Sequence, residues 1–369
     1  MPERTDVFVV GGGPAGLAAA IAARQQGLSV ILADGAEPPI DKPCGEGLMP
    51  ETLIALAELG IQIHEGGGVR FRGIRFIQKG VQVSAEFSRG QGLGIRRPLL
   101  HEKLVAKAKE CGVQLLWKTA VVGIEDAGVR LSGKRIEARW IIGADGSGSR
   151  VRKWSGLEAA ARKSQRYTSR RHYRVRPWSD FLEVYWSGYA QAYVTPTAEE
   201  EICVVMMGES PADASFDEAL RGMPNLGERL AHAELNSHER GAITFRSKLR
   251  KVCNENVALV GDASGGVDAI TGEGLRLAFR HALTVAEAMA SGKLEGYVRA
   301  HRRLEKRPSQ MGALLLLLGH KDKLRARVVQ AMAARRDLFG RLMAIHQGHA
   351  TVAEMVKTGA MLGWQFLIA

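Results

Sequence analysis

The chain has 369 residues, of which 46% are hydrophobic and 24% are charged, a balance typical of a globular protein with a full core. Its four cysteines form no CxxC pair and no cluster with histidine, so no disulfide framework or structural metal site is expected, and a reducing cytoplasm is the natural setting. The net charge of +12 comes without a helix-turn-helix, zinc-finger or RNA-binding signature, which argues against a nucleic-acid partner.

The N-terminal segment predicts one βαβ unit. DVFVV has the composition of a buried strand, and the glycine-rich turn GGGPAG follows it. An alanine-rich helix then runs to Gly27, and LSVILAD is a second buried strand. The opening apolar run is too short for a signal peptide or a membrane span.

The middle of the chain is dominated by predicted strands. Residues 69–88 alternate between apolar and polar side chains, which predicts two strands of a half-solvated sheet, and a helix follows in PLLHEKLVAKAKECG. Short strands recur up to residue 145, and a second β-rich region extends from residue 167 to residue 249. A further buried strand, NVALVGD, precedes a helix that begins after TGEG, and the remainder is helical.

These elements predict an α/β fold in which a Rossmann-like nucleotide-binding domain is interrupted by a β-rich substrate domain and followed by a C-terminal helical segment. The predicted nucleotide domain is discontinuous and comprises residues 1–68, 96–165 and 250–290. The substrate domain comprises residues 69–95 and 166–249, and the helical region comprises residues 291–369.

Gly11, Gly13 and Gly16 match the GxGxxG pattern of dinucleotide-binding turns. The first glycine permits a tight turn, the second lets a pyrophosphate approach the backbone, and the third lets helix and strand pack closely. The helix that follows offers free N–H groups and the positive end of its dipole to the phosphates. Asp34 ends the second strand, where a carboxylate can accept hydrogen bonds from ribose hydroxyls.

Two later segments favour FAD over NAD as the dinucleotide. One strand ends at Asp145, with Arg150 just beyond it, and another ends at Asp262. FAD is a long molecule whose two ends must both be held, and Asp262 can bind ribityl hydroxyls, whereas a simple NAD domain needs neither segment. The helix that opens near Gly272 and Gly274 would direct its N–H groups at the flavin, where its dipole favours the reduced ring.

With these motifs in order, the chain resembles the flavoprotein superfamily of p-hydroxybenzoate-hydroxylase-type monooxygenases, flavin halogenases and geranylgeranyl reductases over residues 5–290. The resemblance implies a glutathione-reductase-type βαβ unit that holds FAD, with NAD(P)H as a transient electron donor. Asp145 and Arg150 resemble the fingerprint linked in the hydroxylases to both cofactors. The residues that the resemblance implies at the FAD site are Gly13, Ala15, Asp34, Cys44, Gly45, Gly47, Arg97, Val121, Asp262, Gly274 and Leu275.

Cys44 is the candidate catalytic residue. Its segment KPCG resembles the reductases, which place a cysteine beside the flavin ring, while GEGLMP resembles a loop of halogenases and related monooxygenases. Two interpretations stay open. Cys44 is either a wall or proton-relay group at the flavin ring, or a small side chain that permits close packing.

The resemblance leaves the reaction open. The WxWxIP signature of halogenases is absent, and Tyr193 and Thr195 depart from the aromatic signature of the reductases. Hydroxylation of an aromatic or lipophilic small molecule through a flavin peroxide is placed first, and reduction of carbon–carbon double bonds in a prenyl or other lipid substrate is the alternative. A non-catalytic escort-type protein is a remote third, because the phosphate-binding glycines are intact.

Two further features concern the substrate and the surroundings. Tyr185, Trp186, Tyr189 and Tyr193 either line an apolar substrate pocket or pack within the predicted sheet. From residue 301 to residue 341 there are eleven Lys or Arg and three Asp or Glu. This basic helical segment is either a solvated surface that closes the substrate domain or a peripheral contact with an anionic membrane.

Overall fold

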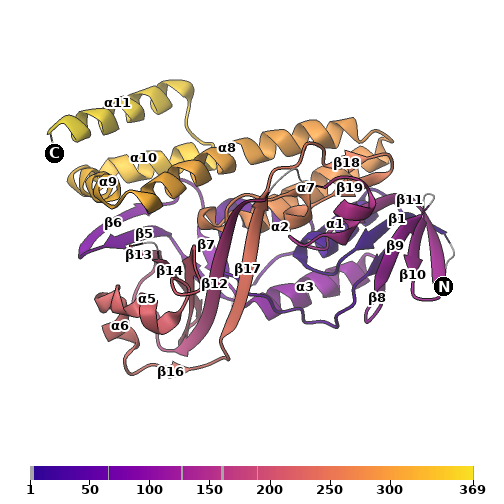
Figure 1. The fold of residues 1–369 in the computed structure, drawn as a ribbon, viewed down its shortest axis with the longest axis horizontal. Helices are drawn as coiled ribbons and strands as arrows, with labels where there is room; N and C mark the ends of the chain where they lie inside the picture. Colours follow the sequence, from indigo (N-terminus) through magenta and orange to yellow (C-terminus); the bar gives the residue numbers. More distant parts are fainter. Residues whose placement is uncertain (1–3, 65, 126–127, 159–161, 189, 369) are drawn as a thin grey trace.

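The computed structural model describes residues 4–64, 66–125, 128–158, 162–188 and 190–368 (Figure 1). The sheet that contains the N-terminal βαβ unit has the strand order β18 (Cys253–Asn254), β19 (Val257–Leu259), β11 (Lys134–Gly143), β1 (Arg4–Val10), β2 (Val30–Ala33) and β8 (Gln114–Leu116). The pairs from β19 to β8 are all parallel. Their carboxyl ends therefore meet at one edge of the sheet, where ligands of such folds bind.

Four helices cover one face of this first sheet, and two strands and a short helix cover the other. α1 (Pro14–Gln25) begins at the glycine turn, and its run of alanines is buried against α7 (Gly274–Ala290), because small side chains let the two helices approach closely. α2 (Pro50–Glu58) and α3 (Arg97–Glu110) complete this layer. A second apolar cluster includes side chains of α4 (Arg150–Trp154), β9 (Val121–Glu125) and β10 (Gly128–Leu131).

The second sheet is mostly antiparallel. Its order is β16 (Glu234–Leu235), β12 (Arg162–Arg174), β15 (Glu201–Gly208), β14 (Ala190–Ala198), β13 (Leu182–Ser187), β5 (Gly73–Gln78) and β6 (Val81–Glu86), with β17 (Arg240–Ser247) also paired to β12. α5 (Phe216–Arg221) and α6 (Pro224–Leu230) pack against it. A small sheet of β3 (Gly47–Leu48), β7 (Gly92–Gly94) and β4 (Val69–Phe71) lies where the two large sheets meet.

The C-terminal helices connect the two sheets. They are α8 (Glu295–His320), α9 (Asp322–Ala334), α10 (Arg336–Gln347) and α11 (Val352–Ile368). α8 packs on α7, whereas α9 and α10 pack on β6, so that their apolar side chains close over one face of the second sheet (Figure 1). Within the described residues, the helices are too short or too polar to cross a bilayer.

The predicted fold class is confirmed, since a parallel nucleotide-type sheet, a β-rich second sheet and a helical C-terminal segment are all present. One local prediction is wrong. Residues 69–88 hold three strands rather than two, because β4 pairs with β7 in the small sheet while β5 and β6 form a hairpin in the second sheet. The alternation changes phase at Gly73, because the apolar positions 69 and 71 are followed by the apolar positions 74 and 76, so the sequence does mark the change of sheet.

Candidate flavin-binding site

A cavity of about 850 Å³ opens at the carboxyl ends of β1, β2 and β11 and extends under the second sheet and the C-terminal helices. Nearly all of the residues predicted to bind the cofactor line it, although they come from distant parts of the chain. These are Gly11, Gly13, Ala15, Asp34, Cys44, Gly45, Gly47, Arg97, Val121, Asp145, Asp262, Gly272, Gly274 and Leu275. Arg150 lines the cavity too, whereas Gly16 does not. Contact of these residues with FAD stays a prediction.

Each glycine of the turn has a separate physical reason to lack a side chain. Gly11 has a φ of +111°, and a Cβ atom there would lie 2.5 Å from the Ala144 carbonyl oxygen. A Cβ atom at Gly16 would lie 1.8 Å from the Gly11 oxygen, so this glycine serves the packing of α1 on the turn. At Gly13 a Cβ atom would meet no protein atom within 4 Å. That free space beside the start of α1 fits a pyrophosphate.

Two side chains hold the glycine turn in place. The Asp34 carboxylate accepts hydrogen bonds from the N–H groups of Gly12 (2.6 Å) and Ala36 (2.7 Å). His101 of α3 is buried and bonds through Nε2 to the Gly12 carbonyl oxygen at 2.8 Å. Burial lowers the pKa of His101, so the neutral imidazole donates this bond. Sequence reasoning missed His101 because a single histidine on an amphipathic helix matches no motif.

Arg97 and Asp262 supply charge to the same end of the cavity. The Nε atom of Arg97 is buried and has no hydrogen-bond partner among the described residues. The Asp262 carboxyl group faces the cavity. Desolvation by the surrounding protein raises its pKa, and the positive charges of Arg97 and Lys42 offset only part of this rise. An unpaired arginine nitrogen and an acceptor beside an open glycine turn fit the phosphate and hydroxyl groups of FAD.

The start of α7 is tied to the C-terminal helices. Gly272 adopts a φ of +66°, and α7 begins two residues later. Between them, Glu273 forms ion pairs with Arg276 and, at 2.8 Å, with His346 of α10. Burial alone would raise the pKa of Glu273, but the hydrogen bond from His346 and the charge of Arg276 lower it below its usual value. The helix that faces the candidate flavin site is thus anchored to the tail.

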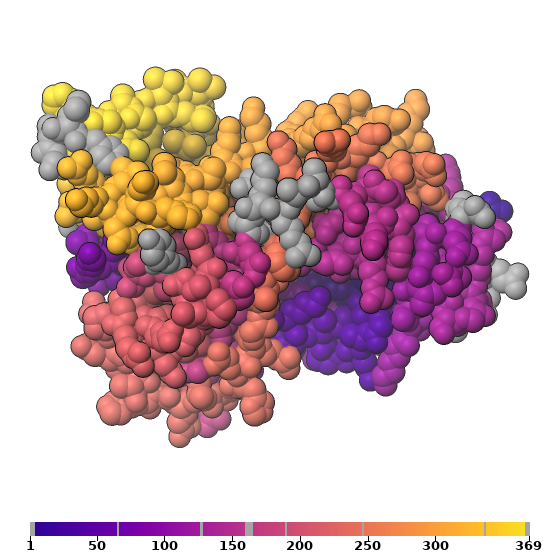
Figure 2. Space-filling model, in the orientation of Figure 1, coloured from indigo at the N-terminus to yellow at the C-terminus, as the bar shows by residue number. Residues whose placement is uncertain are grey.

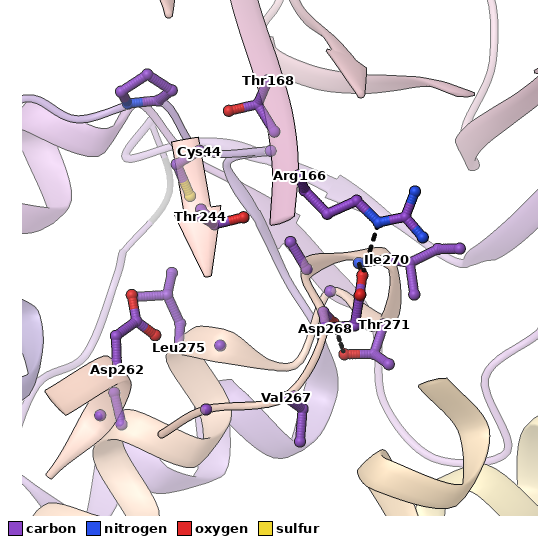
Figure 3. A pocket seen from close by; sticks show the side chains of 18 of the residues that line it. Cys44, Arg166, Thr168, Thr244, Asp262, Val267, Asp268, Ile270, Thr271 and Leu275 are labelled. Atoms are coloured by element: carbon purple, nitrogen blue, oxygen red, sulfur yellow. Dashed lines mark hydrogen bonds and ion pairs between the residues drawn. The ribbon is translucent and has the colours of Figure 1, made fainter. Parts of the chain in front are cut away.

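Cys44 lies in the loop that leads to the small sheet, and its half-buried side chain lines the cavity. Figure 3 shows its sulfur and the Asp262 carboxylate directed toward the same space, with Thr244 of β17 nearby. The Cys44 sulfur accepts the N–H group of Glu46 at 3.4 Å. The next carbonyl oxygen, that of Gly45, accepts the Thr195 hydroxyl at 2.7 Å. The loop is therefore fixed on both sides.

Glu46 is the buried anchor of this loop. It has a φ of +57°, a strained conformation for a residue other than glycine. Its carboxylate accepts hydrogen bonds from His172 Nε2 (2.8 Å), from Arg170 (3.2 Å) and from the N–H group of Arg97 (2.9 Å). The hydroxyl of Ser237 lies 2.7 Å from the other imidazole nitrogen of His172. One carboxylate thus joins the Cys44 loop, β12 and the start of α3.

The three side chains Glu46, His172 and Cys203 lie close enough for metal coordination, with their ligand atoms within 4.8 Å of one another. However, the Arg170 guanidinium already supplies a positive charge to the Glu46 carboxylate. Burial also raises the pKa of Cys203 well above its usual value, which keeps the thiol protonated. The arrangement is that of a structural polar network.

A signal in the sequence could have revealed this network. Arg166, Thr168, Arg170 and His172 occupy alternate positions of β12, so they point to one face of the strand, and all four are buried. A run of buried polar residues on one face of a strand is uncommon unless hydrogen-bond or ion-pair partners lie opposite them. Only the fold identifies those partners, because Glu46 is 124 residues from Arg170 and 126 from His172.

The loop between η1 (Gly261–Ser264) and α7 carries a second polar group. Asp268 accepts the Nε of Arg166 at 3.2 Å and the N–H group of Ile270 at 3.1 Å, as Figure 3 shows. The Tyr193 hydroxyl donates to the Ile270 carbonyl oxygen at 3.1 Å. Burial raises the pKa of Tyr193, so it stays a neutral donor. These bonds hold the loop that contains η2 (Ala269–Thr271) against the second sheet.

Beyond this polar end, the cavity becomes an apolar chamber. Phe76 stacks on Trp186 at 5.6 Å between ring centroids and meets Phe339 of α10 at 5.2 Å. The other apolar side chains of the chamber come from α8, α9 and α10 and include Met311, Leu314, Leu315, Leu318, Val329, Met332, Leu342 and Met343. The apolar chamber is therefore built by the second sheet and the C-terminal helices together.

The aromatic residues of the second sheet divide between the two predicted roles. Trp186 and Tyr193 line the cavity. Tyr185 instead packs in the core under α5 and α6 and donates its hydroxyl to Glu183. Tyr189 lies outside the described residues.

Comparison with known proteins identifies the family. The model of a protein family described as "FAD binding domain" matches residues 4–296. The chain belongs to this family. A menaquinone reductase of Mycolicibacterium smegmatis is 27% identical over 81% of this flavoprotein and 80% of that protein. A digeranylgeranylglycerophospholipid reductase of Methanothermobacter thermautotrophicus is 26% identical over 82% and 81%. A flavoprotein/dehydrogenase from Cytophaga hutchinsonii shares the fold at a TM-score of 0.80 with 20% identity, over 94% and 93% of the two chains.

The flavoprotein is thus an FAD-dependent oxidoreductase of the superfamily to which monooxygenases and geranylgeranyl reductases belong, as the sequence predicted. The residues of the nucleotide end, by which we mean Gly11, Gly13, Asp34, Arg97 and Asp262 with their neighbours, satisfy the demands of FAD. Bound there, FAD would supply two-electron redox chemistry that no side chain provides.

Proposed function

We propose that this flavoprotein reduces carbon–carbon double bonds in a lipid that carries a prenyl chain. The observation that carries the proposal is the apolar chamber, which is continuous with the nucleotide end of the same cavity. A chamber walled by Phe76, Trp186 and Phe339 favours a hydrocarbon chain over a polar substrate. The related reductases are named for menaquinone and for digeranylgeranylglycerophospholipid, and both molecules contain prenyl chains.

The proposed reaction adds two hydrogens across one double bond. NAD(P)H, the proposed donor, loses a hydride and becomes NAD(P)⁺, and the hydride ends on one carbon of the substrate. The second carbon takes a proton, which comes ultimately from water. Cys44 is the proposed donor of this proton, because its thiol lines the cavity and belongs to the segment that resembles the reductases.

Hydroxylation, which the sequence analysis places first, remains the competing reaction. It uses the same nucleotide end and the same electron donor, and an apolar chamber also suits an aromatic substrate. Two observations favour reduction as the leading proposal. The named relatives are reductases, and a cysteine lies at the candidate flavin site.

One experiment separates the two reactions. The purified protein is reduced anaerobically with NADH or NADPH in the presence of menaquinone or a geranylgeranyl lipid, and products are analysed by mass spectrometry. Reduction of the prenyl chain predicts a product two hydrogens heavier, formed without oxygen. Menaquinone products are reoxidised in air before the mass is measured, because reduction of the quinone ring to the quinol also adds two hydrogens. Isotope-labelled oxygen in the product of a parallel aerobic reaction would instead establish hydroxylation and overturn the proposal.

A pair of cysteine variants tests the role of Cys44. Cys44→Ala removes the proposed proton donor, so turnover should fall at least tenfold, while FAD content and flavin reduction by NAD(P)H stay near the wild-type level. Cys111→Ala is the matched control, because Cys111 also carries a free, half-buried thiol but lies at the end of α3, away from the cavity. Equal turnover of both variants would leave Cys44 with a packing role only.

A further inference from the structure

The last helix, α11, exposes a continuous apolar stripe. Val352 is 77% exposed, Val356 is 69% exposed and Trp364 is 61% exposed. Met355 is exposed as well, and small exposed residues fill the rest of the stripe, namely Gly359, Ala360 and Gly363. These seven positions follow one another by three or one residues in alternation, which places them along one face of the helix.

The opposite side of α11 is the one that packs on the protein. Thr358 and Gln365 are buried there, and Met361 and Leu362 join the apolar cluster between α9, α10 and the second sheet. The stripe is therefore more apolar than the buried side of its own helix. Lone exposed apolar residues are ordinary, but a contiguous stripe marks an interaction surface.

The location of α11 connects this stripe to the cavity. Leu362 lines the cavity beside Leu342 and Met343 of α10. Figure 2 shows α11, in yellow, on the outside of the molecule above the other tail helices, with no described segment covering it in that view. One side of α11 thus contributes Leu362 to the apolar chamber, while the stripe on the other side points away from the protein.

The surroundings of α11 are cationic. From Lys321 to Lys357 there are eight Lys or Arg and three Asp or Glu, an excess of five positive charges, and among the described basic side chains of this segment Arg325 is the one that is buried. α11 packs directly on α9 and α10. An apolar helix face next to basic helices fits a surface that offers hydrocarbon and negative charge together.

We propose that α11 docks on an anionic lipid bilayer and lies in its surface, with Val352, Val356 and Trp364 inserted among the lipids. The helix is not long and apolar enough to cross the bilayer, so it lies in the interface. A second copy of the chain is a poorer occupant, because pairing two such stripes would bring the cationic α9 and α10 of both copies together. Docking would bring the apolar chamber, which lies under α11, close to the phase in which a lipophilic substrate dissolves.

Vesicle co-sedimentation of the full-length protein tests this docking. Vesicles of phosphatidylglycerol and phosphatidylcholine should bind the wild type at least tenfold more tightly than pure phosphatidylcholine vesicles. The double variant Val356→Asp with Trp364→Asp should lose at least tenfold of that affinity, because it places charge in the stripe. Leu235→Asp is the matched control, since Leu235 is 59% exposed on β16, far from α11, and this variant should bind as the wild type does.

Each other outcome counts against the proposal. Undiminished vesicle binding by the double variant, or by the single variant Val352→Asp, would show that the stripe is not the docking surface. A dimer in light scattering that the double variant converts to monomer, without vesicle binding by the wild type, would identify a second copy as the occupant. FAD content and NAD(P)H oxidation in solution report on the redox site separately, so a failure of docking would leave the proposed reaction untouched.

Discussion

The two ends of the cavity are built in different ways. The nucleotide end is made mainly of backbone, where Gly11 and Gly13 leave room for a ligand and Asp34 fixes the turn through the N–H group of Gly12. The apolar chamber is made of side chains from elements far apart, such as Phe76 of β5 and Phe339 of α10. A methyl group added to the glycine turn would either strike the backbone, as at Gly16, or fill the space left for the ligand, as at Gly13, whereas a wall of side chains can be altered one residue at a time. Mutations in the nucleotide end should therefore readily weaken FAD binding, whereas single substitutions in the chamber wall should change the preference for substrates.

The largest effect is expected at Glu46, which joins the Cys44 loop to β12 and to the start of α3. Glu46→Ala leaves the buried Arg170 and His172 without their shared partner, so the free energy of unfolding should fall by about 4 kcal/mol. Denaturant unfolding of the purified variant measures it. Arg72→Ala breaks an exposed ion pair with Glu86 and should cost under about 1 kcal/mol. Similar losses for both variants would mean that Glu46 is no special anchor.

Two glycine variants distinguish, within the nucleotide end, a glycine needed for packing from a glycine that leaves space for the ligand. Gly16→Ala forces a methyl group onto the Gly11 carbonyl oxygen, so stability should fall by about 3 kcal/mol and FAD should be lost. Gly13→Ala adds a methyl group where no protein atom lies within 4 Å, so the apoprotein should unfold as the wild type does.

The readout that separates these two variants is flavin titration. Gly13→Ala should weaken FAD binding at least tenfold without a change in apoprotein stability, because the methyl group occupies the approach of the pyrophosphate. Unchanged FAD affinity in Gly13→Ala would place the dinucleotide elsewhere.

A substitution in the apolar chamber should change the kinetics with the substrate and leave the affinity for FAD unchanged. Leu314 and Leu317 are 44% and 48% exposed on the same helix, α8, but only Leu314 lines the cavity. Leu314→Asp should lower kcat/KM for a long prenyl substrate about tenfold, or about 1.4 kcal/mol, while FAD affinity is unchanged. Leu317→Asp should leave kcat/KM near the wild-type value. Steady-state kinetics with long and short prenyl chains make the comparison, and equal effects would argue against a prenyl chain in the chamber.

The smallest effect concerns the link between α7 and the tail. Because the pKa of Glu273 is lowered in the folded state, its contribution to stability is present above the ordinary carboxyl pKa of 4.5 and is lost as the pH falls through the folded value. Glu273→Gln should cost about 1 kcal/mol at neutral pH and less in acid. Thermal unfolding at a series of pH values measures this difference, which would be constant with pH if the ionised carboxylate made no contribution.

The amino-acid sequence alone determined the features that depend on neighbours in the chain. A buried strand, three spaced glycines and an alanine-rich helix fold into one βαβ turn because the strand and the helix directly flank the glycines in the chain, although the turn is also held by the distant Asp34 and His101. Asp34 and Asp262 could be placed for a similar reason, since Asp34 follows directly on the buried strand β2, Asp262 comes shortly after the buried strand β19, and parallel strands end at a common edge.

Only the tertiary structure decided what the distant elements build. Glu46 meets Arg170 and His172 across more than a hundred residues, and Phe76 meets Phe339 across more than two hundred. Such contacts have no fixed spacing along the sequence, so no pattern of residue types predicts them. The same holds for the tail, whose helical period was visible but whose division into cavity-lining and exposed faces depends on what packs against it.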